Sequence, residues 1–507
     1  MHVRPQRSHR LLILGVCVSL IATLAVSRAT ADVPGGPVDG IQQAYEAVRV
    51  PEGSTGTPAN TAAEYEGEPL TVQVVDVGRE SAEPTIGVTS GGAIFYAAGA
   101  FDAFGLGFLA RTEILRSTDD GLTWEKVTAK LPVGIEPDGQ TTLPPTTLDP
   151  YVYVDEDTGR VFQPELYGGC TFLNFSDDDG ETWFSNPVAC GDFVNDHQTI
   201  WTGPPPPGLP TIGYPNVLYY CFNRVIDANC GRSLDGGLTF IPTATPAFLG
   251  FDPLAGGLCG GLHGHIKVDG DGRLFLPKGH CGRPWVAVSE DGGDTWTRVR
   301  VSGHVGSAVT HTALDVDDAG NVYYTWIGAS DRLPYLAVST DHGRTWGDPL
   351  MIAPPGVHEV NFPVLTAGAE GRIAVMFPGG TSTDRTDNRR PWNSYHVVST
   401  NALDETPLFI STTANPEEDP IHRGNCLGRC AGMFDFLDIV TSPADGTFWS
   451  AVTDTCTSRS GCNEASSPGA ANDARGLAVR QLSGPLLRPD AAVADPPEEG
   501  MVESLTR

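Results

Sequence analysis

The chain has 507 residues, with 62 acidic and 32 basic side chains and a net charge of −30 at neutral pH. A surface this acidic repels the phosphates of nucleic acids and anionic membranes, which excludes both as natural partners. The 60 glycines and 41 prolines are typical of a turn-rich β protein rather than a helical one.

The first predicted element is an export signal over residues 1–31. Arginines precede an apolar run from Leu11 to Val26, and small residues follow up to Ala31. This order is typical of a secretory signal, and the apolar run is too short for a membrane span. We therefore expect a secreted protein, extracellular or periplasmic, that has no membrane association after the signal is cleaved.

The clearest pattern is an eight-residue repeat, first present as STDDGLTW at 117–124. It returns as SDDDGETW, SLDGGLTF, SEDGGDTW and STDHGRTW, at spacings of 59, 57, 56 and 50 residues. A period of this size within β-type sequence indicates a propeller or a β-solenoid. The positions expected to build these turns are Ser117, Asp119, Gly121, Trp124, Ser176, Asp178, Gly180, Trp183, Ser233, Asp235, Gly237, Ser289, Asp291, Gly293, Trp296, Ser339, Asp341, Gly343 and Trp346.

One unit, residues 263–303, favours the propeller. Its strand-like runs lie near 265–269, 273–277, 285–289 and 295–301. Asp and Gly fill the connection between the first two runs and that between the last two, as hairpin turns require, because both residues tolerate positive φ. Four antiparallel strands form one propeller blade.

The same order of strands and turns predicts seven units, with six as the alternative. The units begin near Glu83, Asp149, Asp196, His263, His311, Asn361 and Phe434. A strand at 70–77 precedes the first unit and is expected to pair with the last one, which closes the ring and removes an exposed edge.

The predicted fold is therefore all-β. It is a propeller of four-stranded antiparallel blades over residues 67–484, closed by an N-terminal strand. The segments on either side are polar and rich in proline. We expect a flexible N-terminal segment over 32–66 and a disordered C-terminal tail over 485–507.

The five repeats resemble the Asp-box, or BNR repeat, of the sialidase-like superfamily, whose pattern is Ser-x-Asp-x-Gly-x-Thr-Trp. The resemblance covers about residues 84–480 and implies the propeller fold. It also implies glycoside hydrolysis by a tyrosine nucleophile paired with Glu, an acidic acid/base residue, and three arginines that hold a sugar carboxylate. The chain departs from the family in two respects. SAEPTIGV at 81–88 stands where the Phe-Arg-Ile-Pro motif would supply the first arginine, and seven units are predicted whereas sialidases have six blades.

The repeat also indicates which face of the propeller carries the site. Antiparallel order places the repeats at one end of the blades, so the second strands end and the first strands begin at the other end. All ten cysteines after the signal fall at that other end. A functional site is expected there, because long loops held by disulfides on a rigid scaffold commonly carry binding and catalytic residues. We predict five disulfides between neighbours in sequence: Cys170 with Cys190, Cys221 with Cys230, Cys259 with Cys281, Cys426 with Cys430, and Cys456 with Cys462.

Titratable residues gather at the same face. The candidate catalytic residues are Glu165, Tyr167, His197, His265 and His311, and the candidate substrate-binding residues are Arg224, Lys278, His280, Arg283, Arg332 and Asn361. His263, His304 and His358 map to this face as well. We predict no metal and no cofactor. The Asp-Gly turns lack the bidentate Glu of calcium loops, and His263 and His265 form the only pair of these histidines with a metal-ligand spacing; metal binding by two or three of the histidines stays open.

Three functions fit these residues. A sialidase-type exo-glycosidase would use Tyr167 with Glu165, and Arg224, Arg283 and Arg332 would hold the sugar. A polysaccharide lyase would use histidine and tyrosine as base and acid. A non-catalytic propeller would bind a glycan or a protein through aromatic side chains in the loops. We expect a secreted monomer that processes an extracellular glycan or polysaccharide, and the residues leave open whether it is catalytic.

Overall fold

The computed structural model describes residues 35–52, 54, 57–100, 111–129, 149–167, 170–190, 195–224, 227–303, 307–426, 430, 433, 436–456 and 474–491. The side chains of residues 100, 111, 166, 167, 170 and 307–311 lie outside the description. The predicted signal also lies outside it, and the described residues all belong to one unit, Gly35–Arg507. Among the described residues, no helix has the length and apolar character needed to cross a bilayer.

Five sheets have four strands each, and their strands are antiparallel neighbours. In chain order they are β5 (Ala82–Val88), β6 (Ile94–Ala100), β7 (Arg111–Ser117) and β8 (Glu125–Lys126); β9 (Tyr153–Val154), β10 (Val161–Tyr167), β11 (Cys170–Ser176) and β12 (Phe184–Cys190); β13 (Asp196–Gly203), β14 (Val217–Asn223), β15 (Ala228–Ser233) and β16 (Ile241–Pro242); β19 (Lys267–Val268), β20 (Leu274–His280), β21 (Arg283–Ser289) and β22 (Thr297–Arg300); and β33 (Asp438–Thr441), β34 (Phe448–Asp454), β35 (Arg475–Ser483) and β4 (Thr71–Glu80).

Two larger sheets contain the same four-strand order with additional strands. One holds β23 (Ser307–Val316), β24 (Val322–Gly328), β25 (Pro334–Ser339), β26 (Leu350–Met351) and β2 (Val48–Arg49). The other holds β28 (Val364–Ala367), β29 (Ile373–Gly380), β30 (Pro391–Ser399), β31 (Leu408–Thr413), β1 (Gln43–Glu46), β3 (Thr61–Ala62), β27 (Glu359–Val360) and β32 (His422–Arg423). A separate hairpin pairs β17 (Phe251–Asp252) with β18 (Gly257–Leu258).

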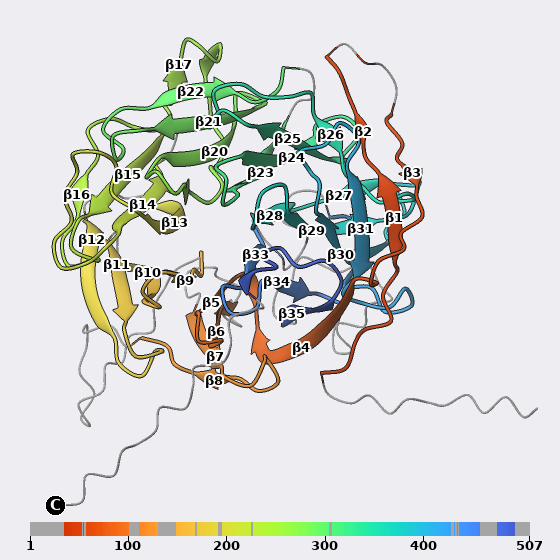
Figure 1. Ribbon diagram of the computed structural model, residues 1–507, viewed down its shortest axis with the longest axis horizontal. Coiled ribbons are helices and arrows are strands. Elements are labelled where there is room, and N and C mark those ends of the chain that lie inside the picture. Colours follow the sequence, from red (N-terminus) through yellow and green to blue (C-terminus); the bar gives the residue numbers. More distant parts are fainter. Residues whose placement is uncertain are drawn as a thin grey trace, which may run out of the picture. The chain divides into compact units, whose positions relative to one another are not determined.

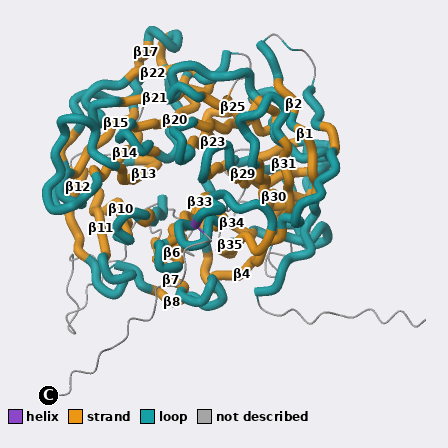
Figure 2. Tube along the Cα trace, viewed as in Figure 1, coloured by secondary structure: helices purple, strands orange, loops and turns teal. Residues whose placement is uncertain are grey.

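Within this unit the sheets stand around a common centre, with the first strands innermost (Figures 1 and 2). Buried aromatic and aliphatic side chains pack the faces of neighbouring sheets together, as where Tyr324 and Trp326 meet Phe275. The predicted all-β propeller is confirmed. The predicted count of seven blades stays a prediction, because the sheets of five and eight strands can be divided in more than one way.

The N-terminal strand closes the ring as predicted. β4 pairs antiparallel with β35, the last strand of the chain, with Val74 opposite Val479 and Val75 opposite Ala478. β4 is the outermost strand of its sheet, so it covers an edge that β35 would otherwise expose. The two ends of the described chain are therefore joined by main-chain pairing.

Both segments predicted to lack structure contribute to the fold. Within 32–66, β1 pairs with β31 and β2 pairs with β26, so this part of the segment extends two sheets. The start of the predicted tail over 485–507 also packs, because Leu487 is fully buried and Arg488 forms ion pairs with Glu156 and Asp318. The ordered domain therefore extends beyond 67–484 at both ends.

In each of the five repeats, the serine and aspartate side chains hold a turn together; we call these the Ser–Asp turns. In the first, the Ser117 hydroxyl donates to Asp119 Oδ1 at 2.8 Å and accepts from the amide of Gly121 at 3.0 Å. Asp119 also accepts from the amide and the hydroxyl of Thr123, at 2.9 and 2.6 Å. The other four copies form the same bonds. The acids are thus engaged inside the turns.

We expect the Ser–Asp turns to lose stability in acid. Burial raises the pKa of Asp341, but hydrogen bonds from Thr345 and Ser339 outweigh it and lower the pKa to about 2. Because this lies below the unfolded value of about 3.9, the stabilisation is present above about pH 4 and is lost as the pH falls toward about 2. Thermal melts from about pH 6 downward should show Asp341→Asn to be less stable than wild type but less acid-sensitive. Equal pH slopes for the two proteins would contradict this role.

Candidate functional site

The end of the blades opposite the Ser–Asp turns holds several of the predicted site residues. Each turn follows the third strand of its sheet, so in the sheet of β13–β16 it follows β15. Asn223, which ends β14, pairs with Asp196, which begins β13, and His280 ends β20 in the next sheet. These positions all lie away from the turns, and we call this end the channel mouth.

Three histidines meet there around one phenylalanine. The ring of His197 lies 5.7 Å from that of His263 and 6.2 Å from that of His265, between centroids. Phe436 lies 5.2 Å from both His197 and His265. Two of the five residues predicted as catalytic are therefore brought together.

The backbone of β13 is distorted at His197. Its φ is 55°, in the left-handed region that costs energy for a side chain with a Cβ. The pairing of β13 with β14 shifts register between Asp196 and Thr199, and Asp149 accepts a hydrogen bond from the His197 amide at 2.7 Å. A bulge held by a carboxylate thus turns this side chain toward the other histidines, and such bulges are common beside functional sites.

Burial keeps two of the imidazoles neutral. The Nδ1 atom of His263 lies 2.7 Å from the carbonyl of Gly264, to which it donates, so Nε2 carries the lone pair. The Nε2 atoms of His263 and His265 are buried and have no hydrogen-bond partner among the described residues. Desolvation lowers the pKa of both histidines well below the usual value. The Nε2 of His263 can therefore accept a hydrogen bond from a ligand.

Lys278 lies beside this cluster. A single antiparallel bridge pairs it with His263, and its side chain is fully buried. Its ammonium group lies 3.4 Å from Asn223 Oδ1 and 5.7 Å from the centre of the Phe248 ring. Burial lowers the pKa of Lys278 to about 8. Part of the Lys278 population is therefore uncharged near neutral pH.

His280 is held in a separate buried network. Its Nε2 lies 3.3 Å from Asp252 Oδ2, and the same carboxylate forms an ion pair with Arg298 at 2.8 Å. Burial lowers the pKa of His280 to about 4. The imidazole is thus neutral and engaged in packing the hairpin of β17 and β18 against its sheet.

The channel continues from His265 toward the Ser–Asp turns, and its lining includes residues that sequence reasoning missed. The Lys267 ammonium lies 3.6 Å from Asp315 and 3.6 Å from the centre of the Trp201 ring. Burial raises the pKa of Asp438 to about 7. The sequence did contain a signal for Lys267. His263, His265 and Lys267 occupy every second position, and such residues of an extended segment face the same side.

The remaining predicted residues are distributed over several sheets. Glu165 is fully buried, accepts a hydrogen bond from Gln163, and has a pKa raised well above its usual range by desolvation. The side chains of Tyr167 and His311 lie outside the description, as does all of His304. His358 is exposed, and its carbonyl accepts a hydrogen bond from Arg385 at 2.9 Å.

The three arginines expected to hold a sugar carboxylate belong to different sheets. Arg224 forms an ion pair with Asp227 at 2.8 Å. Arg283 lies opposite His280 in the pairing of β20 and β21. Arg332 has a positive φ of 65°, and burial lowers the pKa of its guanidinium. In the part of the chain that is described, no contact joins the three.

Three predicted disulfides are confirmed: Cys221–Cys230, Cys259–Cys281 and Cys426–Cys430. Cys190 and Cys456 are also disulfide-bonded, and their predicted partners, Cys170 and Cys462, lie outside the described side chains. Asn361, predicted to bind substrate, donates from Nδ2 to the carbonyl of Cys426 at 2.7 Å. It positions the loop of the third disulfide.

No known protein family and no curated protein matches the sequence. Several solved structures are similar to the chain at low identity. The Niastella koreensis GH74 enzyme is 16% identical over 76% of this chain and 56% of its own, with a TM-score of 0.45. The leech intramolecular trans-sialidase is 14% identical over 81% and 69%, with a TM-score of 0.41. The Hadza microbial sialidase Hz136 is 18% identical over 66% of each chain, with a TM-score of 0.39, so the chain spans about two thirds of that protein's length.

Proposed function

We propose that this protein is a secreted, glycan-processing propeller that acts at the channel mouth. The observation that carries the proposal is the convergence of His197, His263, His265 and Lys278 from separate strands and loops onto one buried site. Neutral imidazoles and an amine with a pKa of about 8 supply the proton acceptors and donors that cleavage of a glycosidic linkage requires. The disulfides suit an oxidising compartment outside the cell.

The more specific form of the proposal is a sialidase-type exo-glycosidase. Tyr167 would be the nucleophile and Glu165 the partner that takes its proton; burial raises the pKa of Glu165 well above its usual range, so this role requires the bound substrate to favour the ionised carboxylate. The arginines would hold the sugar carboxylate. For Arg224 this requires exchanging its bond to Asp227 for one to the substrate. The resemblance of the Ser–Asp turns to the repeat of sialidase-like proteins supports this choice of sugar.

The second candidate is a polysaccharide lyase, and the neutral state of His263 and His265 favours it. A lyase abstracts a proton from the carbon beside a uronate carboxylate, so it needs a base that is unprotonated at working pH. Burial leaves both histidines unprotonated, and a uronate carboxylate beside them would raise their pKa toward the working pH, where a base is effective, whereas a nucleophilic tyrosine does not depend on this. The products of the two reactions differ, which allows a direct decision.

Incubating the purified protein with sialosides and uronic-acid polymers, followed by mass spectrometry, tests both candidates. Free sialic acid that is lost in Tyr167→Phe would support the hydrolase, and unsaturated uronate products would support the lyase. Glycan binding without turnover would leave a non-catalytic propeller and would contradict the processing function.

We expect His265→Ala to lower kcat/KM on the active substrate by about 100-fold or more, because it removes a proton-accepting group that faces the channel. Lys278→Met, which keeps the length of the side chain, should act in the same direction. His342→Asn is the matched control, because His342 lies in a Ser–Asp turn at φ 60°, a conformation that asparagine tolerates. Equal losses in all three variants would indicate a general effect on folding and would contradict a role for the channel mouth.

A further inference from the structure

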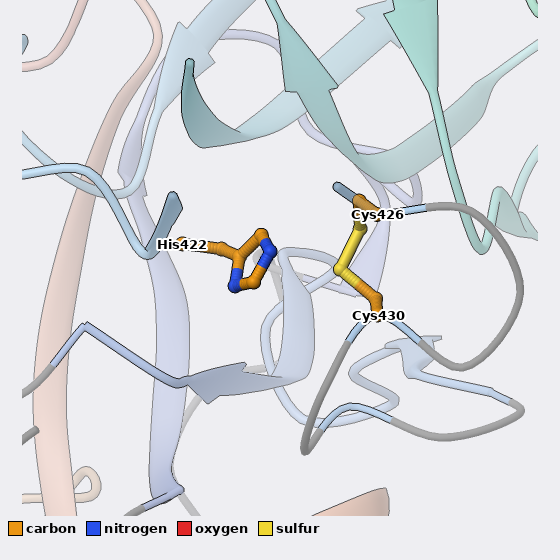
Figure 3. Close-up of side chains that lie close together, drawn as sticks. All are labelled: His422, Cys426 and Cys430. Carbon is orange, nitrogen blue, oxygen red and sulfur yellow. A yellow bond between two sulfur atoms is a disulfide. The ribbon is translucent and has the colours of Figure 1, made fainter. Parts of the chain in front are cut away.

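A second cluster of reactive side chains lies away from the three-histidine cluster, in the loop that precedes the last sheet. His422, Cys426 and Cys430 place one nitrogen and two sulfur atoms within 4.8 Å of one another (Figure 3). The exposed fractions of the three residues are 1%, 0% and 2%. The two sulfurs are joined as a disulfide, which spans only four positions of sequence.

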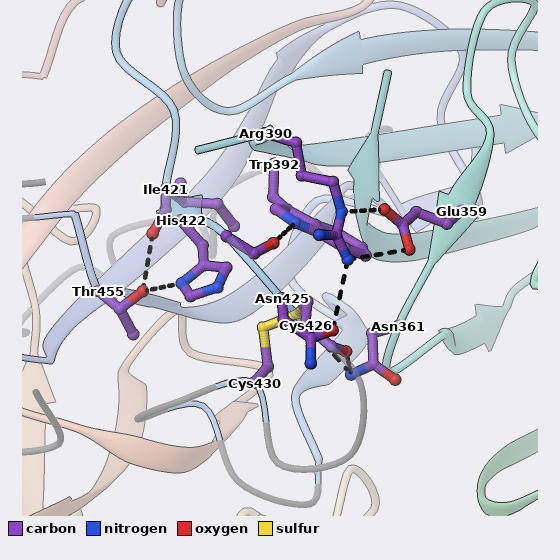
Figure 4. Close-up of a disulfide and its surroundings, with 11 residues drawn as sticks. Glu359, Asn361, Arg390, Trp392, Ile421, His422, Asn425, Cys426, Cys430 and Thr455 are labelled. Atoms are coloured by element: carbon purple, nitrogen blue, oxygen red, sulfur yellow. Dashed lines mark hydrogen bonds and ion pairs between the residues drawn. A yellow bond between two sulfur atoms is a disulfide. The ribbon is translucent and has the colours of Figure 1, made fainter. Parts of the chain in front are cut away.

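The orientation of His422 is set by a hydrogen-bond chain. The Thr455 hydroxyl donates to the carbonyl of Ile421 at 3.2 Å, so its oxygen accepts from His422 Nδ1, which lies 2.7 Å away. The proton of the neutral ring is therefore on Nδ1, and Nε2 carries the lone pair. That Nε2 is buried and faces the disulfide (Figure 4), and zinc would have to displace the interaction of the ring with the main chain of Asn425.

This arrangement is that of a metal-binding histidine. Histidine ligands usually donate their other ring nitrogen to an oxygen that fixes the tautomer and the ring orientation, as Thr455 does here. Two cysteines and one histidine form a common zinc ligand set that leaves a fourth position open. While the sulfurs are bonded to each other, neither is a thiolate, so the set is complete only after reduction.

We propose that His422, Cys426 and Cys430 form a zinc site that opens when their disulfide is reduced. A small thiol reduces the bond: the disulfide gains two electrons and two protons to give two cysteine thiols, and two molecules of reductant are joined as their own disulfide. Zinc then displaces the two thiol protons and binds both sulfurs and His422 Nε2, with water in the fourth position.

The full-length protein tests this without denaturation. It is treated with a phosphine reductant, which takes up oxygen from water as the disulfide becomes two thiols, and is then titrated with Zn²⁺ or Co²⁺ under anaerobic conditions. We expect one Zn²⁺ per chain after reduction and none before, and a thiolate-to-cobalt charge-transfer absorption with Co²⁺. Alkylation and mass spectrometry report whether Cys426 and Cys430 were reduced. A bond that stays closed in the folded protein, or a reduced pair that binds no Zn²⁺, would overturn the proposal.

Variants separate binding from folding. His422→Ala and Thr455→Val should weaken Zn²⁺ binding by about 10- to 100-fold, and Cys426→Ser with Cys430→Ser should abolish it. The control is Cys221→Ser with Cys230→Ser, which removes a different disulfide. Neither of these cysteines belongs to the cluster of His422, Cys426 and Cys430, so Zn²⁺ binding should be unchanged. Melting curves show which variants are folded. Two outcomes would show that the metal binds outside this cluster. One is undiminished Zn²⁺ binding in folded His422→Ala, and the other is loss of Zn²⁺ binding in the folded Cys221/Cys230 control.

Discussion

Replacing Glu359 by glutamine is expected to lower the free energy of unfolding by about 3 kcal/mol. Glu359 and Arg390 form an ion pair in which each side chain is 1% exposed (Figure 4). Guanidinium groups stay charged in proteins, so the variant leaves the cation of Arg390 buried. Its remaining partners are neutral oxygens, the carbonyl of Asp387 at 3.0 Å and the side chain of Asn425 at 3.3 Å. Chemical denaturation measures the loss.

An exposed ion pair provides the control for this prediction. Glu290 pairs with Arg344 at 2.6 Å, but these side chains are 58% and 57% exposed. Water already solvates both groups, so Glu290→Gln should change the free energy of unfolding by less than about 1 kcal/mol. Glu359 begins β27, and Arg390 directly precedes β30. If Glu359→Gln changed the free energy of unfolding no more than this control, the buried ion pair would not stabilise the packing of these two segments.

Sequence predicted the blades well because their signals are local. Glu83 as the start of the first unit agrees with β5 at Ala82–Val88, and Asp196 begins β13 as expected. Asp and Gly turns and alternating side chains act within a few residues, so each hairpin could be recognised alone. The prediction that the strand at 70–77 closes the ring had a different basis. It followed from the need to cover an exposed sheet edge rather than from any local pattern.

Long-range pairing explains what sequence could not predict. Gln43–Glu46 has polar residues and no strand signal, yet it pairs with Leu408–Ser411, more than 360 positions away. Strand formation there depends on a partner strand that is already present, not on the segment's own preference. Similarly, nothing local indicated that Asn361 would bond the carbonyl of Cys426.

At the candidate site, the sequence predicted which end of the propeller carries the residues but not which of them lie in contact. Strand order placed His197 and His265 at one end of the blades, and the structure brings them together. The bulge that aims His197 depends on the carboxylate of Asp149, 48 positions earlier, so no local pattern reveals it. Lys267 and Asp438 lie deeper in the channel, on strands whose polar inner side was not considered.

The closing strand provides the most destabilising substitution that we predict. Val72 in β4 is fully buried, in the cluster that contains Phe448 and Val479. Val72→Asp would bury a carboxylate among these apolar side chains, or require it to be protonated, because the members of that cluster are hydrophobic. We expect a loss of about 4 kcal/mol or more in the free energy of unfolding, beyond what most single substitutions cause.

The same substitution should also uncover the edge of β35, so the variant is expected to self-associate as well as to unfold at lower denaturant concentration. Size-exclusion chromatography and guanidinium titration measure the two effects. Val75→Asp is the matched control, because Val75 lies on the same strand opposite Ala478 but is only half-buried, and water can solvate the new carboxylate. Its loss should be less than half that of Val72→Asp. Similar losses at the two positions would mean that β4 contributes main-chain pairing rather than apolar packing to the closure of the ring.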